Sequence, residues 1–83
     1  MAIRIVFLGE LGARLGREHE LDGPESGLTV AEIRRRLCET VEGACETLGR
    51  SDIRAALDHT LVADAARVRP GQELAFLPVF SGG

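Results

Sequence analysis

The chain has 83 residues, of which 45% are hydrophobic and 28% charged, and its formal net charge is -3. This length favours a single domain over residues 1–83, with one small core that buries only about 60–65% of the extended-chain surface. An acidic chain with three phenylalanines and no other aromatic residue lacks the basic face and stacking residues of a nucleic-acid-binding protein. All ten basic residues are arginine, which excludes a catalytic lysine and self-conjugates linked through lysine.

No segment of the sequence resembles a membrane span or a secretory leader. The longest apolar run, Ile5–Leu8, is far shorter than the roughly 20 residues that cross a bilayer. We therefore expect a cytoplasmic protein without a membrane partner. On one continuous helix, Cys38 and Cys45 would lie about 10 Å apart, too far for a disulfide, and their spacing matches no metal motif. Two buried free thiols and no metal site are expected.

The first third of the chain predicts two strands around a short helix. Ala2–Leu8 alternates at first and then becomes apolar on both faces, which is typical of a strand inside a sheet. The segment Glu10–Gly16 has leucines four residues apart and predicts one or two helical turns that stop at the glycine. Arg17–Leu21 predicts a polar edge strand antiparallel to the first, in which we expect His19 to be solvated.

A dense turn signal at Asp22–Gly27 precedes the main predicted helix, at about residues 29–41. Thr29 as N-cap with Glu32 three residues later forms a capping box. The apolar stripe expected to face the sheet consists of Val30, Ile33, Leu37 and Val41. We expect Arg34–Arg36 on the solvated face, although this basic run could also bind an acidic partner.

Short elements are predicted between that helix and the last strand. Gly43 ends the helix, and Ala44–Leu48 predicts another short helical turn. Ile53–Leu57 and Leu61–Val62 read as two short strands around a tight turn. His59 lies in that turn and is expected to be a turn residue only.

The end of the chain predicts a central strand followed by an extended tail. Arg69–Gln72 fits a type II turn, and Glu73–Leu77 is apolar on both faces, so this strand should lie beside the first one. Pro78 lacks a backbone donor and is expected to end regular pairing. Residues 78–83 then form a flexible tail, whose last five residues can reach about 17 Å.

The order of these elements resembles the α+β ubiquitin-like β-grasp fold, a mixed sheet of four or five strands with one main helix across it. More closely, the chain resembles the small-subunit family of molybdopterin synthase (MoaD), which are sulfur-carrier proteins. Three segments carry this resemblance: Ile3–Gly9, Ala56–Val62 and Pro70–Gly83. The most specific feature is the Gly-x-Glu-x-Ala-Phe-x-Pro strand that leads into Gly82 and Gly83.

The resemblance implies a carrier that is not catalytic alone. A ubiquitin-activating-type (MoeB-like) enzyme would use ATP to adenylate Gly83, and a persulfide would then replace AMP to give a thiocarboxylate. In the family, the large (MoaE-like) subunit of molybdopterin synthase uses this sulfur to convert the cyclic pyranopterin precursor during molybdenum cofactor biosynthesis. Gly82, which has no side chain, would precede Gly83 into the narrow active site of the partner. The sulfur is covalent, so no bound cofactor is expected.

We also expect a docking patch at the root of the tail. Phe80 is the anchor, because a buried aromatic side chain can offset the cost of ordering a tail, and it would act with the apolar surface around Phe7. An alternative reading places Phe7 in the core. The remaining residues expected to contact a partner are Leu77, Pro78, Val79 and Ser81.

Three other functions stay open at the level of sequence. The first is a sulfur carrier for the thiazole of thiamin or for another thio-product, which would share fold and chemistry but not the acceptor. The second is a ubiquitin-like protein modifier, because the same adenylate can be passed to an amine. The third is a non-carrier β-grasp binding module, which would not need the Gly-Gly end.

Overall fold

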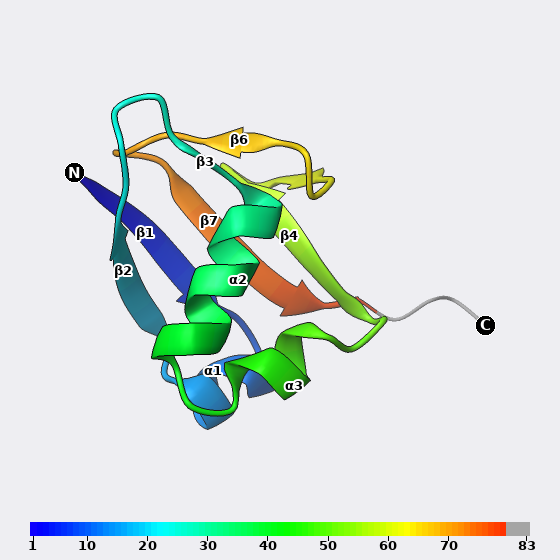
Figure 1. The fold of residues 1–83 in the computed structure, drawn as a ribbon. Helices are drawn as coiled ribbons and strands as arrows, with labels where there is room; N and C mark the ends of the chain where they lie inside the picture. The colour runs from blue at the N-terminus through cyan, green and yellow to red at the C-terminus, as the bar shows by residue number, and fades with distance from the viewer. Residues whose placement is uncertain (80–83) are drawn as a thin grey trace.

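A computed structural model describes residues 1–79 of the chain. Its elements are β1 (Ala2–Phe7), α1 (Glu10–Leu15), β2 (Glu18–Asp22), β3 (Leu28–Thr29), α2 (Val30–Thr40), α3 (Ala44–Leu48), β4 (Ile53–Leu57), β5 (Thr60–Val62), β6 (Arg67–Val68) and β7 (Glu73–Pro78). Five strands form a mixed sheet in the order β2-β1-β7-β4-β5, in which only β1 and β7 run parallel (Figure 1). The α+β β-grasp prediction is confirmed.

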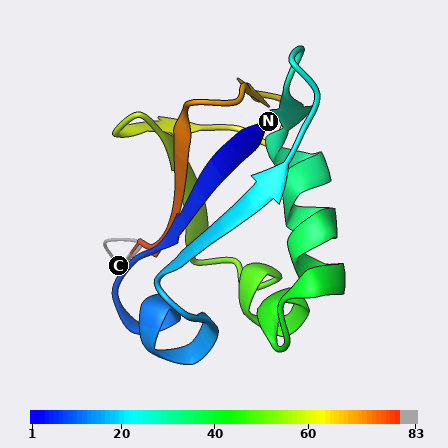
Figure 2. The ribbon, with the colours of Figure 1, turned by 90° about the vertical axis from the view of Figure 1, so that its left-hand side faces the viewer.

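The helix α2 forms where its local sequence signals predict it. The backbone N–H of Glu32 donates to the Thr29 hydroxyl and the Thr29 N–H donates to the Glu32 carboxylate, each at 3.1 Å. Its apolar stripe packs onto one face of the sheet, with Val30, Ile33 and Leu37 fully buried (Figure 2).

In the part of the chain that the structure describes, no helix is long and apolar enough to cross a membrane.

The core lies between α2 and the inner face of the sheet. The rings of Phe7 and Phe76, from the parallel strands β1 and β7, stack with their centroids 5.9 Å apart, and neither side chain is exposed. The expectation that Phe7 contributes to a docking patch is therefore wrong, because a fully buried ring cannot reach a partner. Its alternative placement in the core is correct, since the ring points to the α2 side of β1.

The strand β7 occupies the central position that its sequence predicts. It pairs with β1 on one side and with β4 on the other. The turn before it has the predicted type II features, because Gly71 has φ +92° and the Gln72 N–H donates to the Arg69 carbonyl at 3.0 Å. The alternation along β7 buries Leu74 and Phe76 and turns Ala75 and Leu77 to the other face of the sheet.

A second, two-stranded sheet of β3 and β6 was not predicted, because each strand has only two residues. It closes the end of the core next to the start of α2. Gly27 precedes β3 with φ +87°, and a Cβ on this residue would lie 2.4 Å from the carbonyl oxygen of Val68. The close approach of the two segments therefore requires glycine at this position.

Two polar side chains expected in solvent are partly buried. His19 lies edge-on to the Phe7 ring, and its Nε2 is 2.7 Å from the carbonyl oxygen of Leu15, to which it donates. The guanidinium of Arg34 lies 5.2 Å from the centroid of the Phe76 ring and donates to the carbonyl of Leu48. Both side chains close the edges of the core, so the expectation that they are solvated is wrong.

The two cysteines lie on different helices rather than on one. Cys38 belongs to α2 and is half-buried, whereas Cys45 belongs to α3 and is exposed, so the expectation of two buried thiols is wrong for Cys45. Gly43, with φ +82°, reverses the chain between the helices. The neighbouring Cys45 thiol, together with partial burial, raises the pKa of the Cys38 thiol to about 11.

Candidate functional site

The sheet face opposite α2 carries an apolar groove. No helix among residues 1–79 covers this face, as the edge-on view of the sheet shows (Figure 2). The groove has a volume of about 560 Å³. Its lining side chains come from all strands except β2, β3 and β6 and from the adjoining loops: Val6, Leu8, Arg17, Ala56, Asp58, His59, Leu61, Glu73, Ala75, Leu77 and Val79.

The apolar lining follows from the two-residue period of the strands. In β7, Ala75 and Leu77 point away from the core and remain half-buried on the outer face. Leu61 of β5 is 57% exposed, one of two large apolar side chains that stand out as exposed in the described chain. Solvated apolar surface on three neighbouring strands is the type of surface that a protein partner covers.

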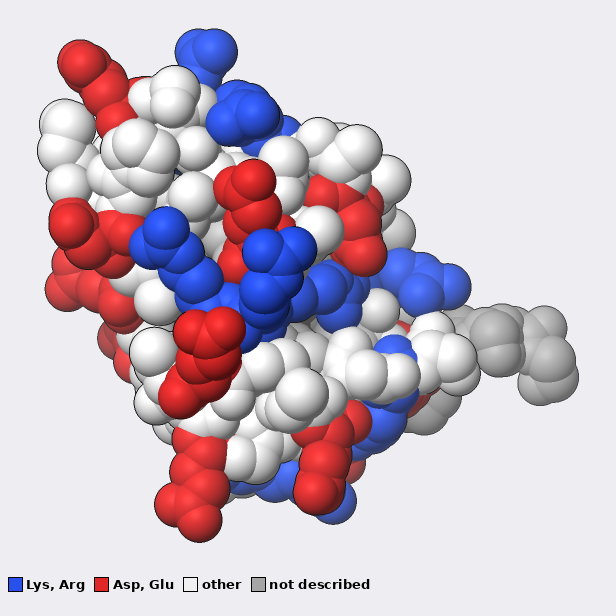
Figure 3. Space-filling view, viewed as in Figure 1, with Lys and Arg blue, Asp and Glu red and all other residues white. Residues whose placement is uncertain are grey.

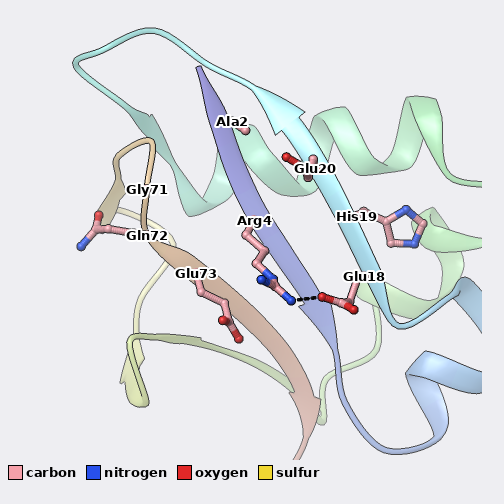
Figure 4. A pocket seen from close by; sticks show the side chains of 8 residues that line it. All are labelled: Ala2, Arg4, Glu18, His19, Glu20, Gly71, Gln72 and Glu73. Atoms are coloured by element: carbon pink, nitrogen blue, oxygen red, sulfur yellow. Dashed lines mark hydrogen bonds and ion pairs between the residues drawn. The ribbon is translucent and has the colours of Figure 1, made fainter.

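The same face becomes charged toward the start of β1. Arg4, Glu18 and Glu73 project there from three neighbouring strands, and Arg4 forms an ion pair with Glu18 (Figure 4). Glu73 lines both the charged recess and the apolar groove, so the two surfaces are continuous. The α2 side differs, because basic and acidic side chains are interspersed over it (Figure 3). The outer face therefore pairs an apolar half with a charged half.

A strained turn forms one rim of the groove. Asp58 and His59, between β4 and β5, both have positive φ, at +47° and +72°. The Gln72 amide donates to the Asp58 carboxylate at 3.1 Å and so ties this turn to the start of β7. His59 is a turn residue, as expected, but it also lines the groove. The sequence alone does not indicate that His59 lines the groove, because this placement depends on how β5 pairs with β4.

The root of the expected tail is held by the sheet. Pro78 pairs with Ile53 of β4 as the last residue of β7, and the Val79 N–H donates to the carbonyl of Asp52 at 2.8 Å. Regular strand pairing ends at Pro78, as predicted, but Pro78 and Val79, which were expected to belong to the flexible tail, are still held by β4 and the residue before it. Proline is tolerated here because its missing donor is not needed for the β4 pairing.

Charged groups surround this root and shift two pKa values. The Arg50 guanidinium forms a two-point hydrogen bond with the Asp52 carboxylate, at 3.0 and 2.7 Å, and a further ion pair with Glu10 at 2.8 Å. These contacts hold the pKa of Asp52 below its ordinary value and raise that of Arg50. Both groups therefore remain charged near neutral pH.

The structure brings some of the predicted site residues together. Leu77 and Val79 line the groove, and Pro78 lies beside them on β7. Phe80, Ser81, Gly82 and Gly83 lie outside the described residues, so their expected roles stay predictions. The apolar residues of the groove that the sequence analysis missed are Val6, Leu8, Ala56, Leu61 and Ala75. The alternation of side chains along each strand could have indicated these residues, because it shows which ones point away from the core. It does not show which strands are neighbours.

The groove offers a binding surface rather than a metal centre. Within residues 1–79, no group of three or more histidine, cysteine, aspartate or glutamate side chains could hold a metal ion. The apolar side chains supply shape and buried area for a partner, and the charged rim supplies orientation. Its far end is Val79, which directly precedes the Phe-Ser-Gly-Gly sequence.

Comparisons with known proteins agree with this architecture. A family model described as the ThiS family matches residues 5–83. The structure resembles small archaeal modifier protein 1 of Haloferax volcanii (18% identity, TM-score 0.78, covering 95% of this chain and 98% of that one). It also resembles a Pyrococcus furiosus protein described as molybdopterin converting factor, subunit 1 (13% identity, TM-score 0.77, covering 96% of this chain and 99% of that one). A third similar structure is a Caldiarchaeum subterraneum ubiquitin (22% identity, TM-score 0.61, covering 100% of this chain and 98% of that one). No curated protein sequence matches the chain.

Proposed function

Because this chain belongs to the ThiS family of ubiquitin-like sulfur carriers, we propose that it carries sulfur as a thiocarboxylate on Gly83 and acts as the small subunit of a molybdopterin synthase. In this role the chain is the substrate of two partners and supplies no catalytic group itself. One partner is an adenylating enzyme that activates the tail. The other is the large synthase subunit, which uses the sulfur on the cyclic pyranopterin precursor.

The proposed chemistry begins at the Gly83 carboxylate. A free α-carboxylate is ionised at neutral pH and is a poor electrophile. Its oxygen attacks the α-phosphorus of ATP, pyrophosphate leaves, and the acyl adenylate forms. A persulfide then displaces AMP, and a thiol cleaves the resulting acyl disulfide to leave the thiocarboxylate, a soft nucleophile. Two consecutive glycines suit this chemistry, because a residue without Cβ fits a narrow active-site channel.

The observation that best supports the proposal is the apolar groove that runs to Val79. A partner that covers the groove would hold the scaffold while the four residues after Val79 extend into its active site. Four extended residues reach about 13–14 Å, enough to separate a docking face from a reaction centre. Phe80, the first of the four, is the proposed anchor between them.

Adenylation and sulfur delivery can be tested separately. The purified protein, its adenylating enzyme and ATP are expected to exchange labelled pyrophosphate into ATP, and a variant lacking Gly83 is expected not to. The synthetic thiocarboxylate form, mixed with the large subunit and the pyranopterin precursor, should then yield molybdopterin. Pyrophosphate exchange without molybdopterin formation would leave the carrier role and refute the assigned acceptor.

A second candidate function is that of a protein modifier, favoured by the structural similarity to small archaeal modifier protein 1. In that function, the activated Gly83 carbonyl passes to a lysine amine of another protein. The chain has no lysine, so its conjugates would contain one copy per target lysine and no lysine-linked chains. Conjugates that persist after reduction and denaturation would favour this function, whereas their absence together with molybdopterin formation would favour the synthase subunit.

A further inference from the structure

The root of the tail is fixed from two sides. On one side, the Val79 N–H donates to the Asp52 carbonyl at 2.8 Å, directly after the Pro78 pairing with β4. On the other side, the Pro78 ring faces the turn between β1 and α1, with its Cγ and Cδ atoms 3.7 Å from the position that a Cβ on Gly9 would occupy. The backbone at Pro78 and Val79 is therefore held in place up to the last described residue.

Arg50 holds the residue that accepts from Val79. Its Nε and Nη2 donate to the two carboxylate oxygens of Asp52, and its Nη1 reaches Glu10 at the start of α1, at 2.8 Å. Asp52 thus uses its carboxylate to bind Arg50 and its carbonyl to bind Val79. One guanidinium links α1, the segment between α3 and β4, and the tail root.

This network lies at the surface and contributes little to the core. The side chains of Arg50, Asp52 and Glu10 are 35%, 41% and 50% exposed. Exposed ion pairs add little to stability, but a planar fork on a carboxylate fixes orientation. Arg50 links these side chains, and the residue that it holds, Asp52, also supplies the backbone carbonyl that accepts from Val79. Their arrangement therefore suits control of direction better than stabilisation of the fold.

A small change of direction at the root has a large effect at the tip. If the chain turned by about 20° at Val79, the end of an extended four-residue segment would move by about 5 Å. A displacement of about 1 Å between reacting groups can cost roughly a hundredfold in rate. The docking groove would still bind its partner, because Arg50 is not among the residues that line it.

We propose that Arg50 is a positioning residue that acts through Asp52 to aim the tail into the active site of the adenylating enzyme. This inference rests on the proposed carrier function. Arg50→Ala is expected to lower kcat for adenylation about tenfold or more with KM unchanged. Arg50→Lys keeps the positive charge but loses the two-point hydrogen bond to the carboxylate. Its kcat is expected to lie between those of the wild type and Arg50→Ala. Asp52→Asn, which weakens the same contact, should behave like Arg50→Ala.

The matched control is Arg54→Ala. Arg54 is an exposed arginine of β4 that donates to the Ser51 carbonyl, so its loss removes the same charge near the same segment but none of the hydrogen bonds or ion pairs among Arg50, Asp52 and Glu10. Its kcat and KM are expected to match those of the wild type. Circular dichroism and thermal melting establish that each variant is folded before its kinetics are compared.

Amide hydrogen exchange at Val79 tests the network without any enzyme. Exchange is expected to accelerate in Arg50→Ala and Asp52→Asn but not in Arg54→Ala. Unchanged exchange in folded Arg50→Ala overturns the inference, as does faster exchange with normal kcat. A raised KM with normal kcat also overturns it, since Arg50 would then contact the partner directly. If the wild type is not adenylated at all, the proposed function fails, and the exchange measurement still decides whether Arg50 holds the tail root.

Discussion

Leu61 offers a direct test of the docking face, because it is the most exposed large apolar side chain of the groove. Leu61 retains 57% exposure in the free protein. Full burial of a leucine side chain contributes about 1.5–3 kcal/mol, so covering the exposed part contributes about 0.9–1.7 kcal/mol. Leu61→Ala should therefore weaken binding of the adenylating enzyme by about 4- to 17-fold. Isothermal calorimetry with the two purified proteins measures this change.

The control for Leu61→Ala is its neighbour on the same strand. Val62 points to the opposite side of β5 and packs against the core. Val62→Ala should lower the melting temperature and leave the dissociation constant unchanged. Leu61→Ala should raise the dissociation constant and leave the melting temperature unchanged. If both variants bind like the wild type, the outer face is not the docking surface. If both weaken binding in proportion to lost stability, the effect of Leu61 is structural.

Three further predictions concern the scaffold. Thr29→Ala should lower the free energy of unfolding by about 0.5–2 kcal/mol in urea titration, because the capping box is lost, and Thr29→Ser should retain most of it. Gly27→Ala should cost more than about 2 kcal/mol, since its Cβ would lie 2.4 Å from the Val68 carbonyl; a stable variant would contradict the left-handed turn. With its pKa raised to about 11, Cys38 should react slowly with iodoacetamide at pH 8 and faster as the pH approaches 11. In Cys45→Ser, which removes the ionisable neighbour, this increase should shift to lower pH, and an identical profile would refute the influence of Cys45 on Cys38.

Elements with strong local signals could be predicted from the sequence. The helix α2 has a capping box and an apolar stripe, and both signals depend only on residues close in the chain. The central position of β7 followed from its being apolar on both faces. The same pattern led to the prediction that this strand lies beside β1, which the structure confirms, whereas the parallel direction of the pair was not predicted.

Features that depend on residues far apart in the chain could not be predicted. Arg34 contacts the carbonyl of Leu48 and the ring of Phe76, which lie 14 and 42 positions further along. The two cysteines meet only because Gly43 reverses the chain. The groove likewise joins residues from four strands, and period-two alternation identifies the exposed side of each strand without giving their order. Phe7 was misplaced for a related reason, since a strand apolar on both faces does not show which face is covered.

The central claim is that Gly83 becomes a thiocarboxylate, and intact-protein mass spectrometry tests it most directly. The protein is incubated with its adenylating enzyme, ATP and a persulfide donor, beside a variant from which Gly83 has been deleted. The account predicts that one oxygen of the wild-type protein is replaced by sulfur, with the change localised to the C-terminal peptide, and that the variant is unchanged. An unmodified wild-type protein, in a reaction where a known carrier is converted, would contradict it.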